Sequence, residues 1–284
     1  MKFGVILDCL KLPLFEGIKI AGELEVQGVQ VYATDGPFSP NKLSSKDKDD
    51  YKKALGENGL SFSALCADMG GYGFQIEKDN AERVEKTKRI IDLAVEFGAK
   101  AITTHIGVIP SDKSEPRYKV MLDALTEIGL YAKEKGVTMA IETGPEDAVT
   151  LKAFLDDTKG GVGVNLDPAN FVMVTGQDPA QAVYLLKDYI VHTHVKDGVM
   201  LKKTDPKIIY DHFAVGGIDG LNTMDYFKET PVGQGSVDFK AYLKALKDIG
   251  YDGYLTIERE TGPNPKEDVE LALTFIKKVL AEIN

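Results

Sequence analysis

Four residues with metal-ligand side chains end four short apolar segments in the second half of the chain. Glu142 ends the segment MAIE, Asp167 ends VGVNLD, His194 lies in HTHV and Glu258 ends YLTIE. Carboxylates are rarely buried without a partner, because an isolated charge loses its hydration. Three carboxylates and one imidazole nitrogen form an oxygen-rich set of ligands, so we expect one divalent metal ion per chain. Manganese is favoured, with magnesium, cobalt and zinc as alternatives.

The alternation of side chains along a β-strand supports the same grouping, because residues two apart share a face. In MAIE, Met139 and Ile141 would face outward and Glu142 inward. The same alternation predicts an inner face for candidate residues of three later segments: Asp167, His192, His194, Lys196 and Glu258. Glu260 shares the parity of Glu258 and is the alternative fourth ligand. Asp167 precedes Pro168, so a turn is the other explanation for that acid.

Eight short apolar segments are predicted to be strands: 2–7, 28–33, 60–65, 100–105, 137–142, 162–167, 189–195 and 253–258. Longer stretches of helical period lie between them. Strands that alternate with helices pair in parallel, and eight such units close into a (β/α)8 TIM barrel, here one domain over residues 1–284. An open, doubly wound sheet is the alternative, but the first strand-to-helix turn lacks the GxGxxG that cradles a dinucleotide.

Local signals mark where the helices begin and end. Glycines 98, 136 and 250 follow helical stretches as stop signals. Asp178 before Pro179 predicts a helix start, as does the pair Asp79–Asn80. Two connections after strands, 34–45 and 198–236, are long for a barrel, so we expect lids or binding walls at its C-terminal face. Five glycines of the second connection indicate either a mobile lid, which we favour, or a phosphate cradle: Gly216, Gly217, Gly220, Gly233 and Gly235.

Composition excludes several classes of function. The net charge of −10 disfavours nucleic-acid binding, which needs a basic face. Cys9 and Cys66 are too few for a disulfide framework or a cysteine zinc site. No segment approaches the roughly 18 apolar residues that span a membrane. We therefore expect a cytoplasmic protein whose partner is a small molecule, with no nucleic acid and no membrane.

Five motifs together resemble the xylose isomerase-like TIM barrel superfamily, more narrowly its sugar phosphate isomerase/epimerase members: ETG (142–144), NLDPANF (165–171), HTHVKDG (192–198), PVGQGSVDF (231–239) and YDGYLTIERE (251–260). The resemblance covers essentially the whole chain and extends to homo-oligomeric relatives. It implies a metal held by Glu142, Asp167, His194 and Glu258, with Glu142 and Glu258 also acting as the acid–base pair. Substrate contacts are expected from four further residues: His105, Asn170, His192 and Lys196.

The resemblance implies a metal-dependent isomerase or epimerase of a sugar or sugar phosphate, acting through an enediolate. Two positions depart from the pattern: Asn170 replaces a histidine of many relatives, and Ala148 a glutamate of some ketose epimerases. They favour a substrate other than a free ketose. A dehydratase of an inosose-type keto-polyol is the main alternative, and a binding protein without turnover is another. An endonuclease IV-like enzyme is remote, because its zinc cluster needs more than the four histidines of this chain.

Overall fold

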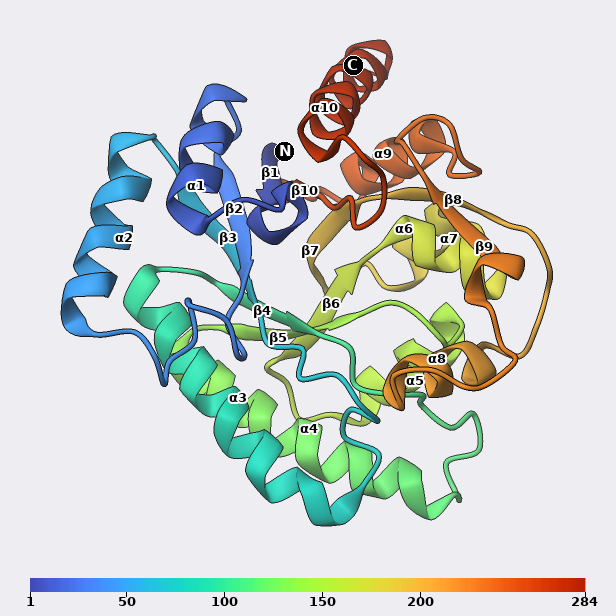
Figure 1. Ribbon diagram of the computed structural model, residues 1–284. Helices are drawn as coiled ribbons and strands as arrows, with labels where there is room; N and C mark the ends of the chain where they lie inside the picture. Colours follow the sequence, from blue (N-terminus) through green and yellow to red (C-terminus); the bar gives the residue numbers. More distant parts are fainter. Residues whose placement is uncertain (284) are drawn as a thin grey trace.

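The computed structural model describes residues 1–283, which form a closed barrel of parallel strands surrounded by helices (Figure 1). Around the ring the strands follow the order β1, β10, β7, β6, β5, β4, β3, β2. Parallel neighbours need a crossover connection between them, and the helices supply it. The predicted (β/α)8 TIM barrel is confirmed, and the open sheet is excluded.

The barrel strands agree with the predicted segments to within one residue at either end. They are β1 (Lys2–Ile6), β2 (Gly28–Tyr32), β3 (Ser61–Cys66), β4 (Ala101–Thr104), β5 (Thr138–Glu142), β6 (Val162–Leu166), β7 (Ile190–Val195) and β10 (Tyr254–Ile257). The helices are α1 (Leu14–Glu23), α2 (Ser45–Glu57), α3 (Glu77–Phe97), α4 (Pro116–Lys135), α5 (Ala148–Asp157), α6 (Pro168–Asn170), α7 (Pro179–Leu185), α8 (Pro206–Ala214), α9 (Phe239–Asp248) and α10 (Pro265–Glu282).

Strand β5 illustrates how the sequence pattern becomes structure. Met139 and Ile141 are fully buried in the apolar core cluster, which also contains Leu125 of α4. Glu142, at the end of the same strand, belongs instead to a polar group inside the barrel, where Nδ2 of Asn165 lies 3.3 Å from its Oε2. The two faces of the strand therefore have the chemistry that the alternation predicts.

The predicted helix stops are confirmed. Gly98 and Gly136 are left-handed C-caps of α3 and α4, with φ of 74° and 70°. Gly250 has φ of 76° and follows α9. Each lies in the region of φ that glycine adopts without strain.

One predicted helix start is confirmed and one is wrong. The side chain of Asp178 accepts a hydrogen bond from the backbone of Ala180 at the start of α7. Helix α3 begins at Glu77, two residues before the predicted Asp79–Asn80 start. The amide of Asn80 donates to the carbonyl of Phe74 at 3.0 Å, so this side chain holds the preceding loop and does not cap the helix.

The long connection after β7 contains its own small elements. Strands β8 (Asp197–Met200) and β9 (Phe227–Thr230) form an antiparallel hairpin, with α8 and the 3-10 turn η3 (Thr223–Asp225) between them. The hairpin packs on α6 and on the single-turn helix η2 (Phe171–Thr175), as the orange and yellow segments of Figure 1 show. Cys9 and Cys66 are both buried and free. Among residues 1–283, no helix is both long and apolar enough to cross a membrane.

Candidate metal centre

The four predicted ligands come together at the C-terminal ends of four neighbouring strands. Glu142 is the last residue of β5, Asp167 follows β6, His194 lies in β7 and Glu258 follows β10. One ligand atom from each residue lies within 4.8 Å of all the others. All four are buried, with exposed fractions of at most 6%. This geometry could hold one metal ion.

His194 turns one ring nitrogen toward the three acids. Its Nδ1 lies 3.4 Å from Oε1 of Glu142, 3.7 Å from Oδ2 of Asp167 and 3.0 Å from Oε2 of Glu258. Its Nε2 lies 3.1 Å from Oε1 of Gln30 on β2. If Nε2–H donates to Gln30, Nδ1 carries the lone pair that a metal requires.

Gln30 is itself oriented by a second hydrogen bond. Its Nε2 donates to Oγ1 of Thr103 on β4 at 3.1 Å, so its Oε1 faces His194 as an acceptor. Gln30 is 1% exposed, so bulk solvent does not reach that oxygen. The side-chain pair fixes the ring of His194 from β2, which β1 and β10 separate from β7 in the ring.

Two buried carboxylate oxygens of the centre, Oδ2 of Asp167 and Oε2 of Glu258, accept no hydrogen bond, although both lie within ion-pair distance of His194 and Lys196. The other oxygen of Asp167 accepts hydrogen bonds from the backbone of Ala169 and Asn170 at 2.7 and 3.1 Å. Asp167 therefore caps α6 with one oxygen, as the turn explanation supposed, and leaves the other for a ligand. Buried carboxylates are costly unless fully compensated, and a divalent cation would bind both oxygens directly.

The charges of the centre draw protons onto its basic groups. Burial alone lowers the pKa of His194 and of Lys196, but the nearby carboxylates, led by Glu258, outweigh it and hold both pKa values well above the ordinary range. Burial raises the pKa of Glu258, but Lys196 and His194 outweigh it and lower this pKa. The site therefore has an excess of negative charge that a cation would balance.

Lys196 separates the two candidate glutamates of the last strand. Its Nζ lies 2.5 Å from Oε2 of Glu260 and 3.2 Å from Oε2 of Glu258. The side chain of Glu260 is 53% exposed and pairs with this lysine outside the four-residue group. The geometry thus favours Glu258 over Glu260 as the fourth ligand.

His105 lies at the edge of the centre, beyond β4. Its Nδ1 is 3.0 Å from Oδ2 of Asp68, and its Nε2 is 3.9 Å from Oε1 of Glu142. Burial lowers the pKa of His105, but Glu142 and then Asp68 outweigh it and raise the pKa to about 10. A hydrogen-bond donor fixed by a carboxylate therefore faces the same space as Glu142.

His192 lies deeper in the barrel. Its Nδ1 lies 2.8 Å from Oδ1 of Asn165, and its Nε2 lies 2.9 Å from Oγ1 of Thr256. Both ring nitrogens are thus occupied, and His192 is not one of the described residues that line the cavity above the centre. The geometry supports a role in holding Asn165, which in turn contacts Glu142 and His194.

A cavity of about 1080 Å³ opens above the centre. Five predicted site residues line it: His105, Glu142, Asn170, Lys196 and Glu258. Nδ2 of Asn170 donates to the carbonyl of Thr143 at 2.9 Å. Residues of α8 and of the β8–β9 hairpin complete its wall. The long connection after β7 therefore forms part of the cavity wall, and its role in binding stays a prediction.

The backbone N–H groups of the glycines between residues 231 and 237 already have hydrogen-bond partners. Oδ2 of Asp197 accepts the N–H groups of Gly233 and Gly235 at 2.9 and 2.8 Å, and its Oδ1 accepts those of Gly198 and Val237. Their amides therefore serve an internal carboxylate, which argues against a phosphate cradle at Gly233 and Gly235.

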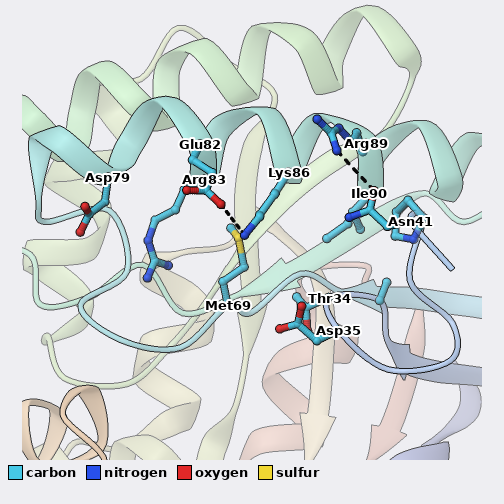
Figure 2. A pocket seen from close by; sticks show the side chains of 12 residues that line it. Thr34, Asp35, Asn41, Met69, Asp79, Glu82, Arg83, Lys86, Arg89 and Ile90 are labelled. Atoms are coloured by element: carbon cyan, nitrogen blue, oxygen red, sulfur yellow. Dashed lines mark hydrogen bonds and ion pairs between the residues drawn. The ribbon is translucent and has the colours of Figure 1, made fainter.

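A second cavity, of about 240 Å³, lies between α3 and the segment after β2 (Figure 2). Three basic side chains of α3 line it: Arg83, Lys86 and Arg89. Lys86 pairs with Glu82 at 2.7 Å, and Arg89 donates to the side chain of Asn41 at 3.3 Å. The 34–45 connection therefore borders a separate cavity. Lys86 and Arg89 in its lining already pair with other lining side chains.

Glu146 is a buried carboxyl in the segment after β5, and it should make stability depend on pH. Its Oε2 has no partner, and burial raises its pKa from 4.5 to about 8. The folded protein then holds a proton that the unfolded chain releases, so this group's contribution to stability falls as pH rises from 4.5 to 8. We expect Glu146→Gln to remove that fall. Between pH 5.5 and 7.5 the difference in unfolding free energy between variant and wild type should shift by roughly 2–3 kcal/mol in favour of the variant, measured by urea unfolding. A constant difference would show that Glu146 is ionised in the folded protein.

Residues 18–279 match a family model described as a xylose isomerase-like TIM barrel. The chain belongs to the xylose isomerase-like TIM barrel family. Within this family, the inosose dehydratase of Clostridium perfringens is 26% identical over 172 residues, which cover 58% of this chain and 56% of the relative. The match therefore spans little more than half of that relative's length.

Solved structures of xylose isomerase-like barrels agree over nearly the full chain. A xylose isomerase domain protein from Planctomyces limnophilus is 26% identical, with a TM-score of 0.79 and coverage of 99% of this chain and 97% of that one. A D-psicose 3-epimerase is 18% identical, with a TM-score of 0.71 and 99% coverage of both chains. At this identity, the second likeness shows the fold alone.

Three residues beside the candidate metal centre escaped the sequence analysis. Asp68 follows strand β3 as Glu142 ends β5, so the same signal of an acid at a strand end could have found it. Gln30 has no such signal, because it lies within a strand and acts across the barrel. Tyr210 comes from α8, and only the folded insertion brings its ring to 5.9 Å from that of His105.

Proposed function

We propose that this chain is a divalent-metal-dependent isomerase or epimerase of a sugar or sugar phosphate. The observation that carries the proposal is the buried group of three carboxylates and one histidine, two of which, Glu142 and Glu258, line a large cavity. Glu142, Asp167, His194 and Glu258 would hold the ion. A divalent ion supplies Lewis-acid stabilisation of negative charge on substrate oxygens. We expect manganese, because the set is rich in oxygen, and a single-domain, cytoplasmic enzyme that can form homo-oligomers.

Glu142 and Glu258 are the proposed acid–base pair. One carboxylate takes the proton from the carbon beside the substrate carbonyl. The electron pair of that C–H bond forms the C=C bond of an enediolate, and the carbonyl electron pair moves onto oxygen. Return of a proton to the opposite face of the same carbon gives an epimer. Return to the former carbonyl carbon gives an isomer, because the hydroxyl on the first carbon then passes its proton to the former carbonyl oxygen and becomes the new carbonyl.

Neighbouring side chains would support that proton transfer. Lys196 lies 3.2 Å from Glu258 and carries a positive charge next to the developing negative charge. His105, held by Asp68, presents its Nε2 near Glu142, where it can donate to a substrate oxygen. Asn170 lines the same cavity and is a further proposed substrate contact.

A dehydratase is the second candidate, and the 26% identity to an inosose dehydratase favours it. The first step would be the same. The enediolate would then expel a hydroxyl group from the next carbon, and this group would leave as water with a proton from one of the two glutamic acids. The two candidates therefore differ only in the fate of the enediolate.

Proton exchange tests the proposal. The protein is loaded with Mn²⁺, freed of excess metal and incubated in D₂O with ketoses, aldoses, their phosphates and inosose-type ring ketones. After transfer to a metal-free buffer, NMR reports lost C–H signals and mass spectrometry reports lost water. We expect deuterium at one carbon beside a carbonyl, and only with metal-loaded protein. Loss of water would select the dehydratase, and absence of exchange with every compound would overturn the isomerase proposal.

A further inference from the structure

Helix α8, in the long connection after β7, brings one polar side chain to the cavity above the metal centre. Four of its residues line the cavity: Ile209, Tyr210, Phe213 and Ala214. Of these four, Tyr210 alone has a polar side-chain atom, and its neighbour Ile209 is 2% exposed and anchors the helix at this point. The connection therefore adds a hydroxyl group to a site that is otherwise built at strand ends.

Hydrogen bonds fix both ends of α8. At its start, Oδ1 of Asp205 accepts the N–H of Lys207 at 2.9 Å as a helix cap. Near its end, Nδ1 of His212 accepts the N–H of Ile218 at 3.0 Å. A helix held in this way keeps the ring of Tyr210 in a defined place.

The hydroxyl of Tyr210 lies against the backbone of Gly144, two residues after Glu142. A Cβ atom at position 144 would lie only 2.0 Å from Oη and 2.8 Å from Cζ of Tyr210. Gly144 does not belong to the glycines with positive φ, so its backbone conformation does not require glycine. The close approach of the hydroxyl does require it. Gly144 thus leaves the space in which a phenol oxygen reaches the end of β5.

This hydroxyl has no hydrogen-bond partner among residues 1–283. Two tyrosines away from the cavity do have partners: Tyr118 donates to Asp157 at 2.6 Å, and Tyr184 donates to Asp248 at 2.7 Å. Phenylalanine would fill the same space as Tyr210, because only the hydroxyl distinguishes the two side chains. A donor that no protein group uses, at the wall of a cavity, indicates an acceptor on a ligand.

The surroundings keep Tyr210 protonated. Burial, followed by the charges of Glu146 and Glu142, raises the pKa of Tyr210 well above its ordinary value. The side chain is therefore a neutral donor and not a base. The ring centroid of His105 lies 5.9 Å from that of Tyr210, so two donors border the cavity on the side of Glu142.

We propose that Tyr210 is a substrate-binding residue whose hydroxyl donates a hydrogen bond to a substrate oxygen beside Glu142. The inference rests on the proposed function, which places a substrate rich in oxygen on the metal centre. A donor next to Glu142 fixes the substrate relative to the carboxylate that exchanges its proton. A compound without an oxygen at that position leaves the donor unpaired, so Tyr210 also contributes to specificity.

Erythronohydroxamate is the probe for the test, because it is a polyhydroxy chain whose hydroxamate group binds divalent ions through two oxygens. Calorimetry gives its Kd for Mn²⁺-loaded protein, and the bound metal is counted in the same sample. Tyr210→Phe removes one oxygen and keeps the ring, so binding should weaken roughly tenfold or more, as for a hydrogen bond to a charged ligand. Unchanged affinity would overturn the inference, and so would absence of probe binding to the wild type.

Tyr184→Phe is the matched control. It removes the same atom from a tyrosine of α7 that is 47% exposed and lies outside the cavity lining. We expect it to bind the probe as the wild type does. An equal loss of affinity in Tyr184→Phe and Tyr210→Phe would show that the effect does not come from the cavity, and would also overturn the inference.

Gly144→Ala tests the same contact from the other side. The added methyl group has no room beside the hydroxyl, so the ring must move and probe affinity should fall. In the Tyr210→Phe background the same change should cost much less, because the hydroxyl that it displaces is already gone. Equal costs in the two backgrounds, at equal metal content, would contradict a role of the hydroxyl.

The inference and the proposed function fail in different ways. Weaker probe binding in Tyr210→Phe, without deuterium exchange in any compound tried with the wild type, would uphold the contact and overturn the proposed isomerase. Exchange with the same kcat/KM in Tyr210→Phe and the wild type, at equal probe affinity, would uphold the isomerase and overturn the contact.

Discussion

Replacing Glu258 by Gln should slow substrate proton exchange by about 10²–10⁴-fold, the range that a general acid–base group contributes. Glutamine keeps the shape of the side chain but cannot accept the proton. Glu258 is 5% exposed and contacts His194 and Lys196, so the amide would also weaken the metal site. Exchange is therefore measured at saturating Mn²⁺, with the bound metal counted in the same sample.

Glu260→Gln is the matched control for this variant. It makes the same chemical change two residues further on, at a side chain that also pairs with Lys196 but is half exposed. We expect it to retain exchange to within about tenfold, since a partly exposed ion pair contributes little. The two-base mechanism fails if metal-loaded Glu258→Gln exchanges substrate protons at the wild-type rate. Exchange lost only in Glu260→Gln would reverse the assignment of the two glutamates.

Replacing His194 by Ala should lower metal affinity by at least about 100-fold. Loss of partners that merely orient a ligand costs 10–100-fold, and here the ligand nitrogen itself disappears. The remaining three carboxylates would also repel one another without the ring between them. Dialysis against a limiting concentration of Mn²⁺, followed by elemental analysis, should give well below one ion per chain.

His212→Ala controls for incidental binding of metal by histidine. His212 lies on α8, outside the four-residue group, and its Nδ1 accepts the N–H of Ile218 at 3.0 Å. This variant should bind metal as the wild type does. Wild-type occupancy in His194→Ala would remove the histidine from the ligand set and leave an all-carboxylate site.

The sequence predicts the barrel and the grouping of the four candidate ligands because both follow from short-range rules. Alternation along a strand fixes which side chains point inward, and parallel strands bring their carboxyl ends to one face. The prediction of Glu142 and Asp167 as ligands needed no knowledge of distant contacts. The same rules would have reached Asp68, which also follows a strand.

Other parts of the site depend on contacts that no local pattern encodes. Gln30 acts on His194 from a strand 164 positions away in the chain. The glycines near 233 resemble a phosphate loop, yet the carboxylate of Asp197 occupies their amides. In each case a tertiary partner decided between two locally acceptable arrangements.

The hydrogen bond between Gln30 and His194 also links the metal to the folding of the chain. These residues lie on β2 and β7, which β1 and β10 separate in the ring, so the bond exists only after the last strand has closed the barrel. A partly folded chain without β10 also lacks Glu258. The ion should therefore bind late and stabilise the closed ring over open intermediates by mass action. The metal proposed for catalysis would then also stabilise the closed barrel against opening.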